Sequence, residues 1–317
     1  MATGEIVAWL NSDDYYFPYA VSTAVRRFQE DPELTLFYGD GVLATRLGHF
    51  RGYYAYVEPF DRNRLFSCSD YIMQPTTFFR REALFEVGLL ESSLQYVMDW
   101  DLWCRFAKQD YRFHYEPRPI AVNRVYLGTK TSTRDWSRLQ EIYRLIRRYQ
   151  TGLWPHGFFG YLLTFIRESN LAGVVKKGAM AMVLMANWRN LTHELRHQRI
   201  LYGIDGRANN LCASSVTLYL PILRPCRHLL LQLHVPFSKA MREQSADVFV
   251  SGSYAFTHKF EFDTGPQMVV VPVGPTPHEA RYIQVDLRFL NSTPWRTVRN
   301  LYRRQDIACF FKGCQLV

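Results

Sequence analysis

The chain has 317 residues, of which 48% are hydrophobic, 21% charged and 15% aromatic, and its formal net charge is +9. These proportions indicate a globular protein that can bury a core, and the length is that of two domains. The positive charge favours anionic partners such as nucleotide-linked ligands or a membrane surface, but the sequence has no nucleic-acid-binding signature, so nucleic acid is not expected as a partner.

Strand and helix signals alternate in the first part of the chain. Glu5–Leu10 is a short apolar run that ends in turn-forming residues, which is typical of a buried strand. The sequence then predicts a helix over Ala20–Phe28, strands over Leu34–Tyr38 (closed by a turn at Gly39-Asp40-Gly41) and Tyr71–Phe79, and helices over Arg81–Val87 and Asp99–Lys108. This alternation predicts an α/β layered domain over residues 1–133.

The periodicity of the sequence then changes twice. Residues 134–204 are predicted as a helical connector, because an amphipathic stripe is given by Leu139, Ile142, Tyr143, Ile146 and Tyr149. From residue 205 the period becomes two, which predicts an all-β sandwich or jelly-roll domain over residues 205–317. The predicted strands are Val216–Leu220, His228–Val235, Val248–Ser251, Lys259–Phe262, Met268–Val273 and Arg281–Phe289.

Cysteine spacing and hydropathy bear on the cellular compartment. The six cysteines form no CxxC pair, so neither a zinc ribbon nor a redox motif is predicted, and we expect reduced thiols in a cytoplasmic protein. The N-terminus lacks the basic region of a signal peptide. The uncharged stretch 149–166 is broken by Pro155 and is shorter than the about 20 apolar residues that span a bilayer. We therefore expect at most peripheral contact with the inner face of the plasma membrane.

Two pairs of carboxylates are candidates for chemistry. Asp13 and Asp14 follow the first predicted strand, at the end where ligands bind in open α/β sheets. Two acids there can hold Mg²⁺ or Mn²⁺, which would neutralise a departing nucleoside diphosphate. Asp99 and Asp101 begin a predicted helix, where a carboxylate can accept the proton of an attacking hydroxyl. Each pair taken alone is explained better by capping of a helix.

The order of three segments resembles one enzyme family. Residues 2–15 (ATGEIVAWLNSDDY) resemble the donor-binding strand and DxD-type motif of family 2 glycosyltransferases. Residues 74–81 (QPTTFFRR) resemble the segment before their acceptor loop, and residues 88–105 (GLLESSLQYVMDWDLWCR) resemble that loop and the ED-type motif. The resemblance implies the C-terminal half of a GT-A nucleotide-diphospho-sugar transferase fold. The half that holds the nucleotide base is then expected to be lost by truncation or supplied by another chain.

The resemblance also implies roles for single residues. Asp14 matches the acid that binds the divalent metal, and Asp13 matches its neighbour, which faces the ribose and phosphates. Asp99 matches the catalytic base, and Asp101 matches the acid that orients the helix or the acceptor. The other substrate-binding candidates are Gln74 near the sugar, Trp100 within the ED-type motif, and Arg124 and Lys130, which could hold the diphosphate.

Two positions depart from the family pattern. Met98 stands where many members have the glutamate of the ED motif. Tyr126 stands where relatives often have a metal-binding histidine, and a phenol with a pKa of about 10 is a poor ligand for Mg²⁺ or Mn²⁺.

The resemblance extends to the C-terminal part and to function. Residues 202–206 (YGIDG) and 291–306 resemble a β-sandwich domain appended to some bacterial glycosyltransferases. The expected function is metal-dependent, inverting transfer of a sugar from a nucleotide-sugar donor to a glycan or lipid-linked glycan, in bacterial surface polysaccharide synthesis. The alternative is a truncated, non-catalytic glycosyltransferase that binds glycans or assembles with other proteins.

Overall fold

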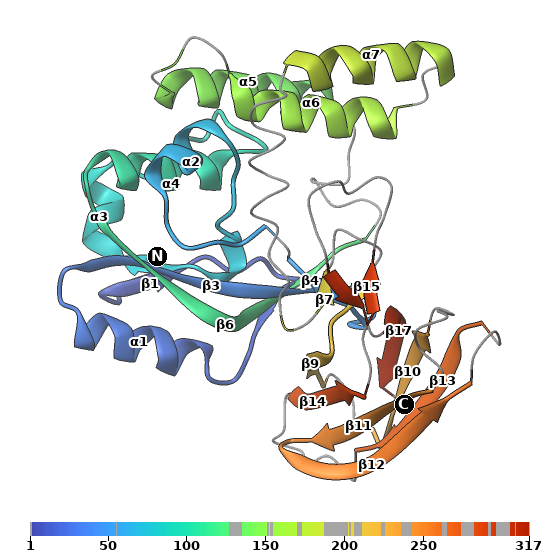
Figure 1. The fold of residues 1–317 in the computed structure, drawn as a ribbon. Coiled ribbons are helices and arrows are strands. Elements are labelled where there is room, and N and C mark those ends of the chain that lie inside the picture. Colours follow the sequence, from blue (N-terminus) through green and yellow to red (C-terminus); the bar gives the residue numbers. More distant parts are fainter. Residues whose placement is uncertain are drawn as a thin grey trace.

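The computed structural model describes most of the chain, and the account below concerns these residues only. They are residues 2–54, 56–126, 135–150, 152, 155–169, 173–186, 202, 204–205, 211–222, 226–235, 243–261, 265–273, 282–290, 293–295, 305–307 and 309–316. They form an α/β part, a layer of helices and a β-sandwich part (Figure 1). The mixed α/β class followed by a sandwich is therefore as predicted, whereas the predicted domain boundaries stay predictions.

A mixed sheet organises the α/β part. Its order is β1-β5-β3-β6-β2, with β4 paired to β3, and only the long β3–β6 pair is parallel. Helix α1 (Ala20–Glu30) covers one face, and α2 (Arg62–Ser67), α3 (Arg81–Glu86) and α4 (Met98–Lys108) lie on the other (Figure 1). The strands are β1 Ile6–Ala8, β2 Tyr15–Tyr16, β3 Leu34–Ala44, β4 Phe50–Tyr53, β5 Phe78–Arg80 and β6 Arg112–Arg124.

Two expectations for this part are wrong. The predicted turn at Gly39-Asp40-Gly41 lies inside β3, because these glycines serve close packing: a Cβ on Gly41 would lie 1.8 Å from Met73 Sδ, and one on Gly39 would lie 2.4 Å from Ile120 Cγ1. The predicted strand Tyr71–Phe79 is instead a 3₁₀ turn (η1, Gln74–Thr76) followed by β5. The turn contains Pro75, whose missing N–H would have left a gap in a strand ladder.

A layer of helices follows and packs beside the α/β part. It contains α5 (Trp136–Tyr149), α6 (His156–Glu168) and α7 (Gly173–Ala186). The predicted amphipathic stripe is confirmed at Leu139, Ile142 and Ile146 of α5, which are buried. It is wrong at Tyr143, which is 44% exposed. Within the described ranges, no helix is long and apolar enough to cross a membrane.

The C-terminal part is a two-sheet sandwich. One sheet has the order β13-β10-β17-β8-β7 and the other β12-β11-β14-β9, and a separate pair is formed by β15 and β16. The predicted strand Lys259–Phe262 starts earlier, because β12 pairs with β11 from residue 253 onward. The strands are β7 Ile204–Asp205, β8 Leu211–Cys212, β9 Ser215–Pro221, β10 His228–His234, β11 Gln244–Val250, β12 Ser253–Phe260, β13 Gln267–Pro272, β14 Tyr282–Phe289, β15 Thr293–Trp295, β16 Gln305–Ile307 and β17 Cys309–Leu316.

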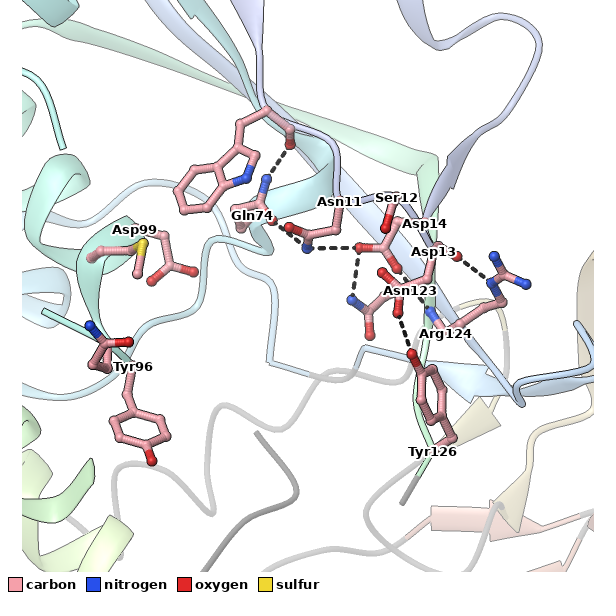
Figure 2. Close-up of a pocket in the computed structure, with 13 residues that line it drawn as sticks. Asn11, Ser12, Asp13, Asp14, Gln74, Tyr96, Asp99, Asn123, Arg124 and Tyr126 are labelled. Carbon is pink, nitrogen blue, oxygen red and sulfur yellow. Dashed lines mark hydrogen bonds between the residues drawn. The ribbon is translucent and has the colours of Figure 1, made fainter. Parts of the chain in front are cut away.

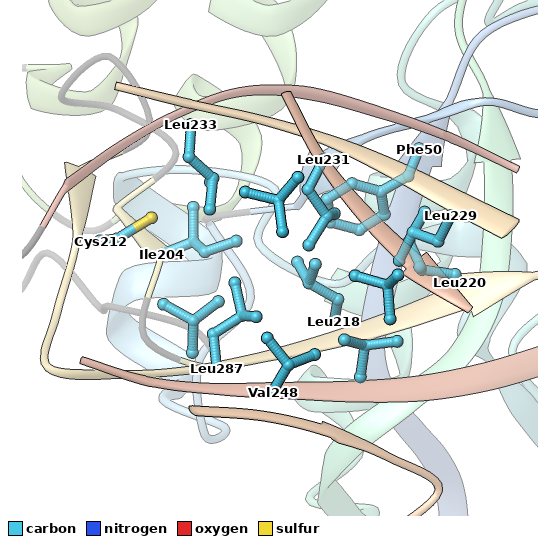
Figure 3. Packing of buried hydrophobic residues seen from close by; sticks show 14 of the residues in the cluster. Phe50, Ile204, Cys212, Leu218, Leu220, Leu229, Leu231, Leu233, Val248 and Leu287 are labelled. Atoms are coloured by element: carbon cyan, nitrogen blue, oxygen red, sulfur yellow. The ribbon is translucent and has the colours of Figure 1, made fainter. Parts of the chain in front are cut away.

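The sandwich and the α/β part share one hydrophobic core. Phe50 of β4 is buried among Leu218, Leu229 and Leu231 of the sandwich (Figure 3). Next to it, Tyr53 Oη donates to the carbonyl of Thr217 at 2.8 Å and accepts the N–H of Tyr219 at 3.0 Å. Apolar packing and buried hydrogen bonds across the boundary fix the orientation of the two parts.

Candidate functional site

A pocket of about 470 Å³ lies where β1 and β6 end and α4 begins (Figure 2). It gathers side chains from segments far apart in the sequence, and a concave site with several convergent polar groups is a candidate for ligand binding. The lining residues are Trp9, Asn11, Ser12, Asp13, Asp14, Gln74, Gln95, Tyr96, Met98, Asp99, Asn123, Arg124 and Tyr126.

Asp14 is the buried member of the first acid pair. It is 7% exposed, its Oδ2 accepts from Asn11 Nδ2 at 3.1 Å and from Asn123 Nδ2 at 3.3 Å, and its Oδ1 accepts the backbone N–H of Arg124 at 3.0 Å. Burial raises the pKa of Asp14, and these three donors oppose the rise. Its hydrogen bonds join the loop after β1 to the end of β6, so Asp14 holds the pocket wall together.

Asp13 is the more accessible acid. Its Oδ2 accepts from Tyr126 Oη at 3.0 Å, and Arg124 Nε donates to its backbone carbonyl. The hydrogen bond to Asp13 raises the pKa of Tyr126, so the phenol stays neutral and acts as a donor. Asp13 also lines the pocket, so a ligand bound there can contact this residue.

Gln74 fastens the same loop from the other side. Its Nε2 donates to the carbonyl of Trp9, and its Oε1 accepts from Asn11 Nδ2 at 3.1 Å. Both ends of the amide are thus engaged by the protein, although Gln74 lines the pocket. Its predicted contact with substrate stays a prediction.

Asp99 lies in the first turn of α4, across the pocket from Asp13 and Asp14 (Figure 2). Its Oδ1 accepts the N–H of Trp100 at 2.9 Å, as the capping alternative expects, while the carboxylate still lines the pocket. Burial raises the pKa of Asp99, and hydrogen bonds to backbone N–H groups and the charge of Arg138 oppose the rise. A carboxylate of raised pKa in a pocket has the properties of a general base.

Trp100 and Asp101 do not line the pocket. Trp100 is 1% exposed and donates from Nε1 to the carbonyl of Leu65 at 2.7 Å. Asp101 is equally buried, and its carboxylate accepts from Arg105 Nε at 2.8 Å, Arg148 Nη1 at 3.1 Å and Tyr149 Oη at 2.9 Å. Both side chains are thus engaged within the protein and not at the pocket, and their predicted contacts with substrate stay predictions. Lys130 lies outside the described residues.

Sequence reasoning missed several residues that shape the pocket. Asn11 and Asn123 hold Asp14, and the second lies only three residues before Tyr126, in a segment already singled out. Buried Glu141 of α5 accepts the backbone N–H groups of Gln95 at 3.0 Å and Tyr96 at 2.8 Å. The sequence does signal this residue, because an acid stands on the apolar face of an amphipathic helix. Its partners could not be predicted, however, because they lie 45 and 46 residues away in the sequence.

The donor set bears on the expected metal. Across the described ranges, no group of three or more His, Cys, Asp and Glu side chains is placed to hold a metal ion. One accessible carboxylate is nevertheless enough for Mg²⁺, which proteins often bind through one or two carboxylates together with substrate phosphates. The residues present fit such a cation at Asp13 better than at Asp14, whose oxygens already accept three hydrogen bonds.

No family model and no curated protein sequence matches this chain. Among solved structures, residues 1–349 of TarS from S. aureus match with 14% identity and a TM-score of 0.31, over 63% of this chain and 52% of that one. Dimeric latent PorU from Porphyromonas gingivalis matches with 9% identity and a TM-score of 0.23, over 32% of this chain and 10% of that one. The CBM36-1 domain of a multidomain xylanase from the hindgut metagenome of Trinervitermes trinervoides matches with 11% identity and a TM-score of 0.21, over 37% of this chain and 73% of that domain. TM-scores in this range do not define a shared fold, and the chain spans about half the length of the solved TarS fragment and a tenth of the PorU chain.

Proposed function

We propose that the pocket transfers a sugar from a nucleotide-sugar donor to a glycan or lipid-linked glycan, with inversion at the anomeric carbon. The observation that carries the proposal is that carboxylates line two opposite sides of one pocket. Asp99 lies on the α4 side, and the Asp13–Asp14 pair lies opposite (Figure 2). Acid groups on opposite sides of a bound sugar suit a displacement in which one side activates the acceptor and the other stabilises the leaving group.

Asp99 is the proposed base. It accepts the proton of the acceptor hydroxyl as the oxygen attacks the anomeric carbon, while the bond to the diphosphate breaks on the opposite side of the sugar. A single displacement of this kind inverts the anomeric configuration. Burial that raises the pKa of Asp99 makes its carboxylate a stronger base.

Asp13 and Arg124 line the side of the pocket that is proposed to bind the diphosphate of the donor. A divalent cation, Mg²⁺ or Mn²⁺, would be held by Asp13 and would supply positive charge for the leaving diphosphate. Asp14 keeps Asp13 in place through its bonds to Asn11, Asn123 and Arg124. In this proposal the α/β part, residues 1–133, is the C-terminal half of a GT-A fold, with Asp14 as a brace.

Nucleotide binding and turnover test the proposal separately. Isothermal titration of UDP, GDP and dTDP into the full chain, with and without Mn²⁺, should show metal-dependent binding to one of them. Asp13→Asn should abolish the effect of the metal, and Asp99→Asn should bind nucleotide like the wild type but lose turnover. Loss of binding and turnover in equal measure in Asp99→Asn, or no binding of any nucleotide, would overturn the proposal.

The helical layer is the proposed membrane contact. Helix α7 is mostly apolar, but several of its apolar side chains are exposed to solvent: Val174 is 85% exposed, Met182 69% and Met185 72%. Exposed Lys177 of α7 and Arg147 of α5 add positive charge to the same layer. Exposed apolar side chains beside basic residues suit the interface of an anionic membrane, where a lipid-linked acceptor would also lie.

Vesicle flotation tests this contact. The full chain should float with phosphatidylglycerol vesicles and less with neutral phosphatidylcholine vesicles. The double variant Met182→Glu/Met185→Glu should stay at the bottom of the gradient, whereas Leu47→Glu, at an exposed apolar residue of the α/β part, should float like the wild type. Equal flotation of all three proteins would contradict a contact through α7.

Glycan binding without transfer is the second candidate function. The outer face of the β12-β11-β14-β9 sheet presents Tyr254, which is 59% exposed, against the ring of Phe249. Beside them, Arg288 lies 4.4 Å from the Phe249 ring, and Asp247 accepts from Thr257 at 2.6 Å. Aromatic faces next to polar groups can stack on sugars. A glycan array with the full chain, in the presence of EDTA, should then show binding that Tyr254→Ala removes, and an array without binders would exclude this candidate.

A further inference from the structure

The carboxyl of Asp70 has no role in the mechanism above, yet its surroundings are unusual. Asp70 lies between α2 and η1, and its Oδ1 is buried without a hydrogen-bond partner among the described residues. Its backbone is held in place, since its N–H donates to Tyr161 Oη at 3.2 Å and its carbonyl accepts from Tyr54 Oη at 3.3 Å. Because a carboxylate oxygen that is buried without a donor is costly, this position favours the protonated acid.

Asp70 lies close to the proposed base. Helix α2, which precedes it, packs against α4 through the hydrogen bond from Trp100 Nε1 to the Leu65 carbonyl. Tyr161, which contacts the Asp70 backbone, has its ring 5.8 Å from that of Trp100, the neighbour of Asp99. Burial, and next the charge of Asp99, raise the pKa of Asp70 well above its usual value.

The two carboxyls differ in how well they can carry a charge. Asp99 accepts a backbone N–H in the first turn of α4, where the helix dipole favours an anion. Asp70 has only the backbone of Ile72 and the charge of Arg138 in its favour. When two acids interact closely, a single proton is shared between them over a wide pH range.

We propose that Asp70 is a positioning residue for Asp99: the pair holds one negative charge, carried by Asp99, and one proton, carried by Asp70. This inference rests on the proposed function, which assigns Asp99 as the base. When Asp99 takes the proton of the acceptor hydroxyl, both carboxyls become neutral, and the proton then leaves from Asp99 to solvent at the pocket opening. Asp70 keeps a second negative charge out of the pocket wall throughout.

Groups on several elements face the pair. Arg138 of α5 favours the ionised form of both acids. Tyr54, after β4, and Cys104 of α4 are kept neutral, because burial raises the pKa of each. Tyr161 of α6 contacts the Asp70 backbone. Arg138 is therefore the one cation among these groups.

The pH dependence of stability tests the pair without any substrate. Asp70 has a higher pKa in the folded state than in the unfolded state, so its contribution to stability is fully present below about pH 4 and is lost as the pH rises through the folded pKa. Asp70→Asn has the shape of the neutral acid at every pH. The Tm of this variant minus that of the wild type should therefore increase by roughly 3 °C per pH unit above about pH 4, until the pH reaches the pKa of Asp70 in the folded state.

A double-mutant cycle tests the coupling to Asp99. In an Asp99→Asn background the neighbouring charge is gone, so the pKa of Asp70 falls and the pH-dependent gain from Asp70→Asn should shrink. Glu82→Gln, at an exposed acid in the first turn of α3, is the control for loss of one carboxylate. The proposal that Asp70 and Asp99 act as a pair would be overturned by a Tm difference that does not change with pH. It would also be overturned if Asp70→Asn raised the Tm equally in the wild-type and Asp99→Asn backgrounds.

The proposed function and the pair can fail separately. Wild-type kcat/KM should show an alkaline inflection where Asp70 loses its proton, and Asp70→Asn should lack that inflection. If the Tm curves behave as expected and no sugar transfer occurs, the acid pair stands and the proposed function fails. If transfer occurs but Asp70→Asn reproduces both wild-type pH curves, the pair is wrong and the proposed function stands.

Discussion

The hydroxyl of Tyr202 donates a hydrogen bond of 2.6 Å to Oδ2 of Asp40, a side chain that is 1% exposed in the middle of β3. The other carboxylate oxygen, Oδ1, accepts from Tyr115 Oη at 2.5 Å. Burial and the charge of Asp40 raise the pKa of Tyr202, so its hydroxyl stays a donor. One buried carboxylate of the α/β sheet is thus held in part by the segment that leads into the sandwich.

Removing this hydroxyl should weaken the whole chain. Tyr202→Phe removes the hydrogen bond to Asp40 Oδ2, and hydrogen bonds to charged groups contribute about 1.5–3 kcal/mol. We expect a loss of that size in the free energy of unfolding, measured by urea denaturation. Tyr254→Phe, which removes an exposed hydroxyl from the sandwich, is the matched control and should unfold within about 0.5 kcal/mol of the wild type.

Phe50 provides a second test of the shared core. Its side chain is 6% exposed among sandwich leucines, so Phe50→Ala leaves a cavity there and should cost about 3–5 kcal/mol. Leu47→Ala, in the turn that precedes β4 and 73% exposed, should change the stability little. If both variants melted at the wild-type temperature, Phe50 would not be part of a shared core.

Asp101 should matter for stability more than for nucleotide binding. Asp101→Asn removes the negative charge to which three donors bond. Breaking a buried ion pair costs about 3–5 kcal/mol. We expect the lower end of this range, because Arg148 is largely exposed. Thermal unfolding measures the loss. Glu30→Gln, at an exposed acid paired with two arginines of α1, should leave the Tm nearly unchanged. Nucleotide binding that fell while the Tm held would instead support the predicted contact with substrate.

The pH profile of turnover should report on Asp99. Because burial raises the pKa of Asp99 above the ordinary value of 3.8, the base is protonated, and kcat/KM falls, at a higher pH than for an exposed aspartate. The midpoint of the acid limb should therefore lie above 3.8. A rate that stayed constant down to that pH would exclude Asp99 as the base.

Local patterns in the sequence were enough for most helices and for the class of each part. α1, α4 and α5 have clear helical spacing, and the sandwich strands alternate with period two. Strand β6 was not predicted, because Pro117 and Pro119 argue against a strand. In the structure the ladder register skips between Glu116 and Pro119, opposite Gly39 and Asp40, so this irregularity accommodates both prolines. That arrangement depends on a partner strand far away in the sequence.

The candidate site was predictable only in part, for a similar reason. The acid pairs stand out because each lies at the end of a recognisable element. How accessible each acid of a pair is depends on distant side chains: Asn123 donates to the buried Asp14, and Arg148 and Tyr149 donate to the buried Asp101. The spacing of residues along one segment contains no information about these partners.

The position of Phe50 inside the sandwich has a practical consequence for engineering. A sandwich cut out at its sequence boundary would open its interior to water where Phe50 and Tyr53 had been, and the α/β part would expose the same two rings. Neither piece is a free-standing module, so tag fusions, domain swaps with other chains and separate expression of either piece should yield aggregating material. Chimeras of this chain should carry residues 50–53 together with the strands that receive them.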